Sequence, residues 1–374
     1  MKNIDILIIT GEPFPIGMAA TNRIISYTKE LAKVRNVRLC TYSRPNEDTN
    51  LFGSFDGIEY FYTGKEKKNS NSRIIRAYRL YKRKFLILGF IIKNRPKSII
   101  YVSRDMNLFL LLRFFTWFLN IKIFREINEA PLYIKNEIKR NFISRLYGLF
   151  DGMVIMTNFI RNYFSFIPDR KCFILPMSVD ISRFDKQNRE DKKYFFYCGA
   201  NLERDGVLDI VKGYIKFCEF NSSYELKLAF PNNNDDYTQK VLSLVENCWC
   251  KEKIQLLGAV NNKDIPFLMQ CATALLTTPH VDYKTGGFPT KLGEYLASGV
   301  PTVVSAIPSL TEYLDENTTF LVKPNSPNEI AKALKDIVEN KEKVQIIIAN
   351  GLNLVKEKFV VKSYIPDLIK FLNV

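Results

Sequence analysis

Short apolar runs alternate with amphipathic segments along the whole chain. Apolar runs typical of buried strands lie at residues 4–10, 37–42, 58–62, 98–103, 121–125, 153–156 and 172–175. Between them, as at 19–33 and 136–150, apolar positions recur every three or four residues, which is the period of an amphipathic helix. Repeated strand–helix units with continuously apolar strands predict a parallel sheet that is covered on both faces.

A polar and charged segment at residues 179–193 interrupts this pattern, and we interpret it as a linker between domains. A second series of elements follows it. Strands are expected at 194–198, 225–230, 254–257, 274–277, 302–305 and 319–322. Helices are expected at 207–220, 237–248, 263–271, 291–298 and 327–339, and residues 344–372 also have a helical pattern.

The whole pattern predicts an α/β fold of two doubly wound, Rossmann-like domains that face each other across a cleft. We expect the first domain at residues 1–180 and the second at 181–355, with a C-terminal helix at about 356–374 that can pack back on the first. In such folds ligands bind beyond the carboxyl ends of the strands.

Residues 73–95 have a helical pattern with two possible interpretations. The apolar stripe of this segment consists of Ile74, Tyr78, Tyr81, Phe85, Leu88 and Ile92, and Arg76, Arg79 and Arg83 follow the same spacing on another face. The helix either packs on the sheet with a solvated basic face or lies at an anionic membrane surface. The apolar stretch 107–123 is interrupted by Arg113 and Asn120, so we interpret it as a buried helix and the next strand rather than a membrane span.

The charge of the chain is concentrated in its first half. Residues 1–180 contain 30 Lys and Arg against 15 Asp and Glu, whereas residues 181–374 contain 24 of each class, so the net charge of +15 belongs to the first half. This asymmetry predicts a polyanionic partner: an anionic membrane surface, a phosphorylated acceptor or nucleic acid. No nucleic-acid-binding motif accompanies the charge, which disfavours nucleic acid.

The cysteines and acidic residues argue against a disulfide framework and a dedicated metal site. The 7 cysteines are odd in number and scattered, which favours reduced thiols in the cytoplasm. The Cys248-Trp249-Cys250 segment lacks partners at zinc-like spacing, and the chain has no Asp-x-Asp motif. We therefore expect no metal requirement.

The segment with the clearest chemistry is residues 285–304, TGGFPTKLGEYLASGVPTVV. Gly286 and Gly287 let backbone N–H groups approach an anion, and a helix that starts near Thr290 directs its positive end to the same place. Lys291 adds a positive charge there, and Glu294 can accept hydrogen bonds from a ribose diol.

This segment resembles the donor-binding signature of the family 4 glycosyltransferases, which have the two-domain GT-B fold. The resemblance rests on Gly287-Phe288, Glu294 and the run Ala297-Ser-Gly-Val-Pro301. It implies that Glu294 binds the nucleotide ribose, and that the backbone of a short loop lies at the diphosphate of a sugar nucleotide. That loop comprises Gly286, Gly287, Phe288, Pro289, Thr290 and Lys291. The family's first glutamate, eight positions before Glu294, is here Gly286, as in relatives with the shorter Phe-Pro-x-Lys-Leu-x-Glu-Tyr form.

Three further segments are similar to this family. Residues 174–184 resemble the interdomain crossover, to which we assign a structural role. Residues 197–206 resemble the loop whose two cations bind the diphosphate, but the matching positions are Ala200 and Asp205. Gly199 keeps the family's glycine at the donor, and Arg204 and Lys291 are the candidates to replace the two cations. Residues 256–260 match the strand end where the base packs, which implies roles for Ala259 and Val260.

The first half offers weaker candidates. The glycine-containing loop 11–21 and the helix after it imply Gly17 and Arg23 near the substrates, although Arg23 has an alternative interpretation as a solvated surface residue. Many relatives carry a histidine after the strand at 121–125, and this chain instead has Glu126, Asn128 and Glu129. We expect one of the two glutamates to bind sugar or acceptor, the alternative being a helix cap.

The only histidine, His280, follows a strand end near the donor loop and could touch the donor.

The resemblance implies a retaining transfer of a sugar from a UDP- or GDP-sugar to a saccharide or polyprenyl-diphosphate-linked saccharide. Together with the charge, it suggests bacterial surface-polysaccharide synthesis by a cytoplasmic protein on the inner face of the membrane. Two rivals remain open: a sugar-nucleotide epimerase, for which the histidine supply is poor, and a catalytically inactive relative that serves as a basic membrane-binding module.

Overall fold

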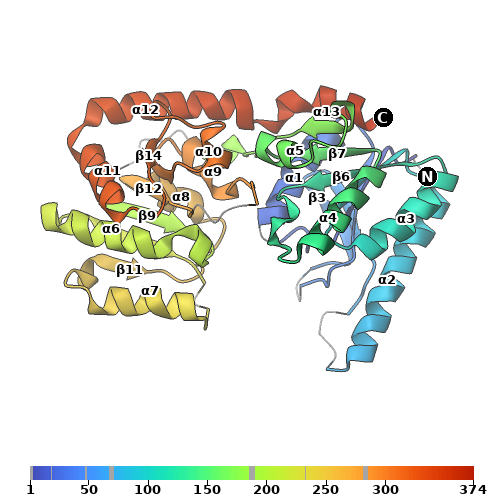
Figure 1. The fold of residues 1–374 in the computed structure, drawn as a ribbon, viewed down its shortest axis with the longest axis horizontal. Helices are drawn as coiled ribbons and strands as arrows, with labels where there is room; N and C mark the ends of the chain where they lie inside the picture. Colours follow the sequence, from blue (N-terminus) through green and yellow to red (C-terminus); the bar gives the residue numbers. More distant parts are fainter. Residues whose placement is uncertain are drawn as a thin grey trace. The chain divides into compact units, whose positions relative to one another are not determined.

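The computed structural model describes residues 3–17, 19–46, 49–66, 71–184, 190–231, 233–280 and 285–374. The chain divides into two compact units (Figure 1), one formed by Met1–Ser178 with Val361–Val374 and the other by Val179–Val360. Part of the predicted linker, residues 185–189, lies outside the described residues.

The first unit is built on a sheet of eight described strands in the order β3-β4-β2-β1-β5-β6-β7-β8. The strands are β1 (Ile6–Thr10), β2 (Val37–Thr41), β3 (Phe52–Phe55), β4 (Ile58–Tyr62), β5 (Ser98–Val102), β6 (Lys122–Ile127), β7 (Gly152–Ile155) and β8 (Cys172–Ile174). β1 lies between β2 and β5 and is buried along its whole length, as its continuous apolar run predicts. The β3–β4 pair is antiparallel, and no strand was expected at the position of β3.

The helices of the first unit connect successive strands, and the last ones come from the end of the chain. They are α1 (Ala19–Ala32), α2 (Arg73–Asn94), α3 (Met106–Phe118), η1 (Pro131–Tyr133), α4 (Glu137–Leu146), η2 (Tyr147–Leu149), α5 (Asn158–Tyr163), η3 (Asp169–Lys171), η8 (Val361–Tyr364) and α13 (Ile365–Leu372). Leu368 and Leu372 of α13 belong to the same buried cluster as Tyr27 and Leu31 of α1. Ser98 also donates a hydrogen bond to the Leu372 carbonyl oxygen at 2.6 Å.

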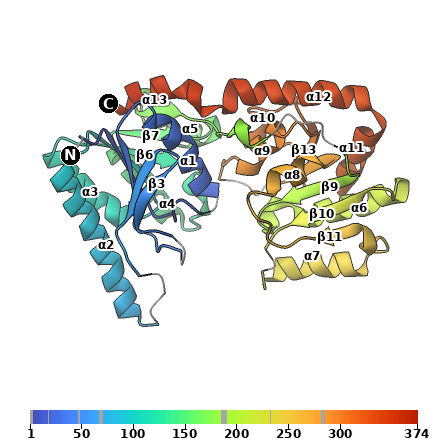
Figure 2. The ribbon, with the colours of Figure 1, turned by 180° about the vertical axis from the view of Figure 1, so that it is seen from behind.

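The second unit has a sheet of six described strands in the order β11-β10-β9-β12-β13-β14. The strands are β9 (Tyr194–Cys198), β10 (Glu225–Ala229), β11 (Ile254–Leu256), β12 (Ala274–Thr277), β13 (Thr302–Ser305) and β14 (Phe320–Val322), and each pairing between them is parallel. The helical segments are η4 (Ile181–Arg183), η5 (Glu203–Asp205), α6 (Val207–Phe220), α7 (Asp236–Asn247), η6 (Lys251–Lys253), α8 (Ile265–Gln270), α9 (Thr290–Ala297), α10 (Pro308–Thr311), α11 (Pro327–Glu339), α12 (Lys341–Leu354) and η7 (Val355–Phe359). α6 and α7 lie side by side (Figures 1 and 2), and residues of both belong to the main buried cluster of this unit.

The prediction of two doubly wound α/β domains is therefore confirmed, because each unit has a largely parallel sheet with helices between its strands. The helical pattern of residues 344–372 is confirmed by α12, the π-helical turn η7, η8 and α13. One local expectation was wrong. The stretch 107–123 is not wholly buried, because the outer side of α3 exposes Phe114, Trp117 and Phe118. Among the described residues, no helix combines the length and the apolar character that a membrane span requires.

Candidate functional site

The start of α9 is fixed to the carboxyl end of β9. The hydroxyl oxygen of the buried Tyr295 accepts a hydrogen bond from the Cys198 N–H at 2.9 Å and is 3.3 Å from the Cys198 carbonyl oxygen, to which it can donate. Because Lys291 and Glu294 precede Tyr295 on the same short helix, this contact places both side chains at the strand end where ligands of such folds bind.

Lys291 carries a desolvated positive charge at this strand end. Its Nζ atom donates to the Tyr197 hydroxyl at 2.8 Å and lies 4.2 Å from the centre of the Tyr197 ring. Burial lowers the pKa of Lys291, and nearby Asp205 opposes that shift. A Cβ atom at Gly199 would lie 2.3 Å from Nζ, so a residue without a side chain leaves room for the ammonium group. A desolvated ammonium group is stabilised by an anion, as a phosphate would provide.

Glu294 forms an ion pair with Arg183 of the η4 turn. The other end of the Arg183 guanidinium donates to the Asn262 carbonyl oxygen at 3.1 Å. Burial raises the pKa of the Glu294 carboxyl, and the positive charge of Arg183 opposes that rise. Arg183 therefore connects the predicted ribose-binding carboxylate to the loop after β11, where Ala259 is exposed and Val260 half-buried.

The loop before α9 is held by its own packing. Gly286 has a φ of 69°, a left-handed conformation that favours glycine, so the glutamate of the family 4 signature would be strained at this position. The buried ring of Phe288 packs against Tyr313 and Phe359, with ring centres 5.8 Å and 5.4 Å away. The Phe288 side chain thus anchors the loop, and contact with a ligand is left to the backbone.

The other loop residues are less informative. Gly287 and Pro289 are buried. The side chain of Thr290 and residues 281–284 lie outside the described part of the chain.

Arg204 and Asp205 of the loop after β9, and His280 after β12, lie at the beginning of α6. Arg204 is exposed, and its carbonyl oxygen accepts a hydrogen bond from the His280 N–H at 2.9 Å. The His280 ring lies 2.9 Å from the Asp209 carboxylate, measured between Nε2 and Oδ2. Gly206 has a φ of 72°, and a Cβ atom there would lie 1.9 Å from the Thr278 carbonyl oxygen, so this position requires glycine.

In the first unit, Arg23 and Glu126 form a buried ion pair with an Nε–Oε1 distance of 2.6 Å. The other Glu126 oxygen accepts from the Tyr27 hydroxyl at 2.7 Å. Arg23 also donates to the carbonyl oxygens of Pro176 and Leu175, at 2.7 Å and 2.8 Å. The interpretation of Arg23 as a solvated surface residue was wrong, since it is 2% exposed. Both oxygens of Glu126 are engaged, so its contacts are those of a structural residue joining α1, β6 and the end of β8.

Glu129 lies in a different environment at the carboxyl end of β6. Its carboxylate pairs with Arg104 at 2.7 Å, and the Arg104 guanidinium lies over the Tyr133 ring at 4.5 Å. The Arg104 side chain is 63% exposed, so this pair is accessible to solvent. Of the two glutamates, Glu129 is therefore the one whose position permits contact with a substrate.

Gly17 lies in the loop between β1 and α1. A Cβ atom there would be 2.1 Å from the Thr21 hydroxyl, which donates to the Pro13 carbonyl oxygen at 2.8 Å. This close approach explains the glycine without a ligand.

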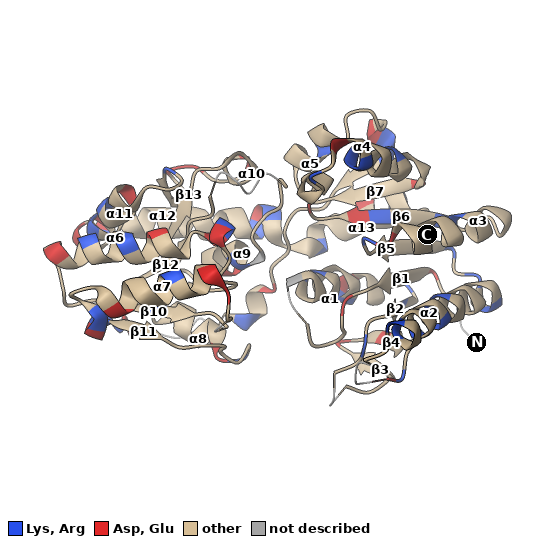
Figure 3. Ribbon diagram, turned by 60° about the horizontal axis from the view of Figure 1, so that its bottom comes forward, with Lys and Arg blue, Asp and Glu red and all other residues tan. Residues whose placement is uncertain are grey.

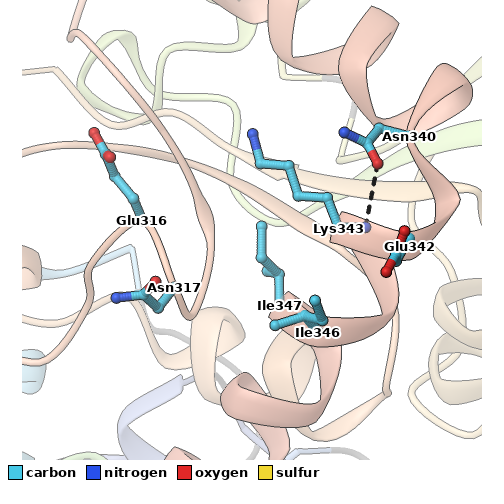
Figure 4. Close-up of a pocket in the computed structure, with 7 residues that line it drawn as sticks. All are labelled: Glu316, Asn317, Asn340, Glu342, Lys343, Ile346 and Ile347. Carbon is cyan, nitrogen blue, oxygen red and sulfur yellow. Dashed lines mark hydrogen bonds between the residues drawn. The ribbon is translucent and has the colours of Figure 1, made fainter.

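Two surface hollows of the second unit contain none of the predicted site residues. One, of about 290 Å³, is shown in Figure 4 and is lined by Glu316, Asn317, Asn340, Glu342, Lys343, Ile346 and Ile347. The other, of about 650 Å³, lies between α6 and α7 and includes Leu208, Lys212 and Gln239. In the described part of the chain, no group of three or more His, Cys, Asp or Glu side chains could hold a metal ion.

The part of the chain that contains Lys291 and Glu294 is similar to known glycosyltransferases. Residues 178–353 match the family model of the glycosyl transferases group 1. A curated relative, an uncharacterized glycosyltransferase of Methanocaldococcus jannaschii, is 22% identical over 231 residues, which are 59% of this chain and 57% of that protein.

Solved structures establish the GT-B fold. Sucrose-phosphate synthase of Thermosynechococcus elongatus has a TM-score of 0.78 at 14% identity, with 98% of each chain covered. HepE of Anabaena in complex with UDP has a TM-score of 0.76 at 12% identity, with 99% of this chain and 100% of that chain covered. The predicted GT-B fold class is therefore confirmed.

Within residues 178–353, the structure brings together several residues that only the family resemblance had assigned to a common site. Lys291, Gly199 and Asp205 lie at one strand end, and Glu294 is joined to the loop after β11 through Arg183. Sequence reasoning missed Arg183, because it gave the crossover a structural role. The available signal was an arginine three residues after Asp180, at the point where the chain enters the second unit.

The buried Arg23–Glu126 pair yields a prediction about stability. Glu126→Ala removes the only carboxylate that pairs with Arg23 in the described structure and leaves a buried guanidinium uncompensated. We expect a loss of about 3–5 kcal/mol in the free energy of unfolding, measured by urea denaturation. The control is Glu59→Ala, since the Glu59 side chain is 59% exposed in its pair with the half-buried Arg38, and its loss should cost at most about 1 kcal/mol. Equal losses in the two variants would contradict the structural role of Glu126.

Proposed function

We propose that this protein is a glycosyltransferase that moves a sugar from a nucleotide-diphosphate sugar to an acceptor hydroxyl. The observation that carries the proposal is the joint placement of Lys291, Glu294 and Arg183 at the carboxyl end of the second sheet, in a region that matches glycosyl transferases group 1. Glu294 supplies the acceptor for a ribose diol, and Lys291 supplies the cation for the diphosphate. The complex of Anabaena HepE with UDP supports a UDP-sugar as the first donor to test, with GDP-sugars second.

The proposed mechanism is a retaining, front-face displacement of the family 4 type. The bond between the anomeric carbon and the diphosphate oxygen breaks as the acceptor oxygen bonds to that carbon on the same face. The acceptor proton passes to the leaving diphosphate. Lys291, Arg204 and the positive end of α9 stabilise the negative charge that develops on the leaving group, without a bound metal. Glu294 positions the nucleoside and does not act as a nucleophile.

The proposed acceptor is a saccharide or a polyprenyl-diphosphate-linked saccharide. Support comes from the charge, because the whole net charge of +15 belongs to residues 1–180, and a diphosphate-linked acceptor is anionic. Glu129, with Arg104, is the candidate for binding the acceptor sugar. On this proposal the protein serves surface-polysaccharide synthesis from the cytoplasmic face of a bacterial membrane.

Thermal unfolding with UDP, GDP, ADP, CMP and their sugars tests the donor site. A ligand that binds only the folded protein raises the unfolding temperature. We expect one nucleotide class to raise the unfolding temperature of the native protein and Glu294→Ala to abolish this rise. The control variant Glu246→Ala, on the exposed side of α7, should keep it. Absence of any rise at millimolar nucleotide would overturn the proposal and favour an inactive relative, whereas sugar isomerisation without acceptor would indicate an epimerase.

Lys291 should affect catalysis more than nucleoside binding. We expect Lys291→Met to lower kcat by about 10²-fold, because the leaving diphosphate loses a desolvated cation, while the affinity for the free nucleoside changes little. Initial-rate kinetics and calorimetric titration with nucleoside and nucleoside diphosphate measure the two effects. A loss of nucleoside affinity equal to the loss in rate would place Lys291 at the ribose or base instead.

Arg183 should set the pH dependence of donor binding. Burial raises the pKa of Glu294 and Arg183 opposes the rise, so Arg183→Ala should raise that pKa further. The ribose diol is bound by the ionised Glu294 carboxylate. As pH falls from about 8 to about 5, Arg183→Ala should therefore lose nucleotide affinity at a higher pH than the native protein does. Arg183→Lys keeps the charge and should keep the native profile. Superimposable profiles for the native protein and Arg183→Ala would exclude this effect.

A further inference from the structure

The apolar stripe of α2 faces solvent instead of the sheet. Ile74 is 82% exposed, Tyr78 65%, Tyr81 55% and Phe85 59%. The interpretation of this stripe as a packing face is therefore wrong for these positions, and Leu88 is the stripe residue that is buried. Exposed aromatic and aliphatic side chains in a continuous row are unusual on a soluble surface and indicate a binding partner.

Ion pairs on the inner face of α2 determine this orientation. Arg83 is buried, pairs with Glu66 at 2.8 Å and donates to the Tyr42 carbonyl oxygen at 3.2 Å. Lys84 is buried and pairs with Asp105 at 2.5 Å. Because these charged side chains occupy the inner face beside Ile87 and Ile91, the stripe with Tyr78, Tyr81 and Phe85 is turned outward.

The neighbouring helix α3 also exposes apolar side chains. Asp105, the partner of Lys84, caps α3 by accepting from the Leu108 N–H at 3.0 Å, so the two helices are joined at this residue. α2 and α3 lie next to each other in Figures 1 and 2. The outer side of α3 carries Leu110, Phe114, Trp117 and Phe118, which are 41%, 58%, 69% and 64% exposed.

Positive charge accompanies this apolar area. α2 spans 22 residues, about 33 Å at 1.5 Å per residue, and contains no acidic residue. Arg73, Arg76, Lys82 and Lys93 are exposed on it. Figure 3 shows blue segments along α2, where Lys and Arg lie. Apolar side chains that can enter a bilayer interface, flanked by cations that meet anionic headgroups, are the features of an interfacial helix.

We propose that the exposed faces of α2 and α3 form one docking surface for an anionic phospholipid bilayer. This α2–α3 surface consists of Ile74, Tyr78, Tyr81, Phe85, Leu110, Phe114, Trp117 and Phe118, with Lys82 and Lys93 beside it. The aromatic and aliphatic side chains enter the interface between headgroups and acyl chains, and the cations bind the lipid phosphates. The inference deepens the membrane location included in the proposed function, but it does not depend on sugar transfer, because lipid binding is measured without donor or acceptor.

The 2 tryptophans of the chain provide a matched pair of reporters. Trp117, on the α2–α3 surface, is 69% exposed, and Trp249, in the second unit, is 62% exposed. Trp249→Phe leaves Trp117 as the only indole, and Trp117→Phe leaves Trp249. Each full-length variant is titrated with vesicles of phosphatidylcholine and phosphatidylglycerol, and in parallel with vesicles of phosphatidylcholine alone. Emission wavelength and quenching by lipids brominated on their acyl chains are recorded.

We expect Trp117 emission to shift to shorter wavelength and to be quenched only when phosphatidylglycerol is present, while Trp249 is unaffected. Adding Tyr78→Ser, Tyr81→Ser and Phe85→Ser should weaken vesicle binding on the order of tenfold or more. A matched variant with Phe220→Ser and Phe267→Ser, exposed in the second unit, should bind as before. Because all these side chains are exposed, circular dichroism should show native folding in both variants.

Four outcomes would overturn the proposal. Equal responses of the two tryptophans would mean unspecific adsorption, and no response of Trp117 would exclude this surface. Equal binding to vesicles of phosphatidylcholine alone would show that anionic lipid is not what the surface binds. A Trp117 shift that grows with protein concentration in the absence of vesicles would assign the surface to a second copy of the chain.

The docking proposal and the proposed chemistry are tested separately. Transfer to a soluble saccharide by a variant that no longer binds vesicles would support docking at this surface and show that the transfer chemistry does not depend on it.

Discussion

The candidate donor site depends on a positive charge kept partly out of water at the end of β9. The Lys291 ammonium group donates to the Tyr197 hydroxyl at 2.8 Å and lies against the space left by Gly199. None of the described carboxylates forms an ion pair with it, although Asp205 is near enough to affect its pKa. A cation in this state has a strong preference for an anionic ligand, because solvent does not supply its full hydration. The hydrogen bonds between Tyr295 and Cys198 keep the helix that bears it in place.

The buried charges of the first unit are arranged differently. Arg23 has a carboxylate and two backbone carbonyl oxygens as partners, and Glu126 has the Tyr27 hydroxyl as its second donor. Such a satisfied network needs no ligand and joins elements that are distant in sequence. Similar residue types therefore have different roles in the two units, and what separates the roles is the set of partners around each charge.

The same reasoning explains the outward apolar stripe of α2. Two cations that would ordinarily be exposed, Arg83 and Lys84, are buried with Glu66 and Asp105 as partners. Since the inner face is occupied by these pairs, aromatic residues face solvent together with the remaining cations. Exposed cations of the first unit therefore lie beside exposed apolar side chains. The cations can bind anionic lipid headgroups, and the apolar side chains can enter the bilayer interface.

The sequence by itself determined the two doubly wound domains, most strand positions and the candidate donor loop. It could do so because parallel strands buried on both faces are continuously apolar, and because a glycine-rich turn before a helix is a local feature. The short antiparallel strand β3, with all its residues exposed, left no such signal. The helical pattern of residues 344–372 is confirmed, but it did not indicate the π-helical turn η7 between α12 and α13.

Only the tertiary structure decided which polar residues are available and which face of a helix is covered. Glu126 and Glu129 are three residues apart, yet one is enclosed by Arg23 and Tyr27 and the other pairs with an exposed arginine. Arg183 joins Glu294 to the loop after β11, although these positions are far apart along the chain. The stripe of α2 has the period of a packing face, but long-range ion pairs turn it outward. Periodicity is a property of neighbouring residues, whereas burial and ion pairing depend on partners that the fold brings from elsewhere.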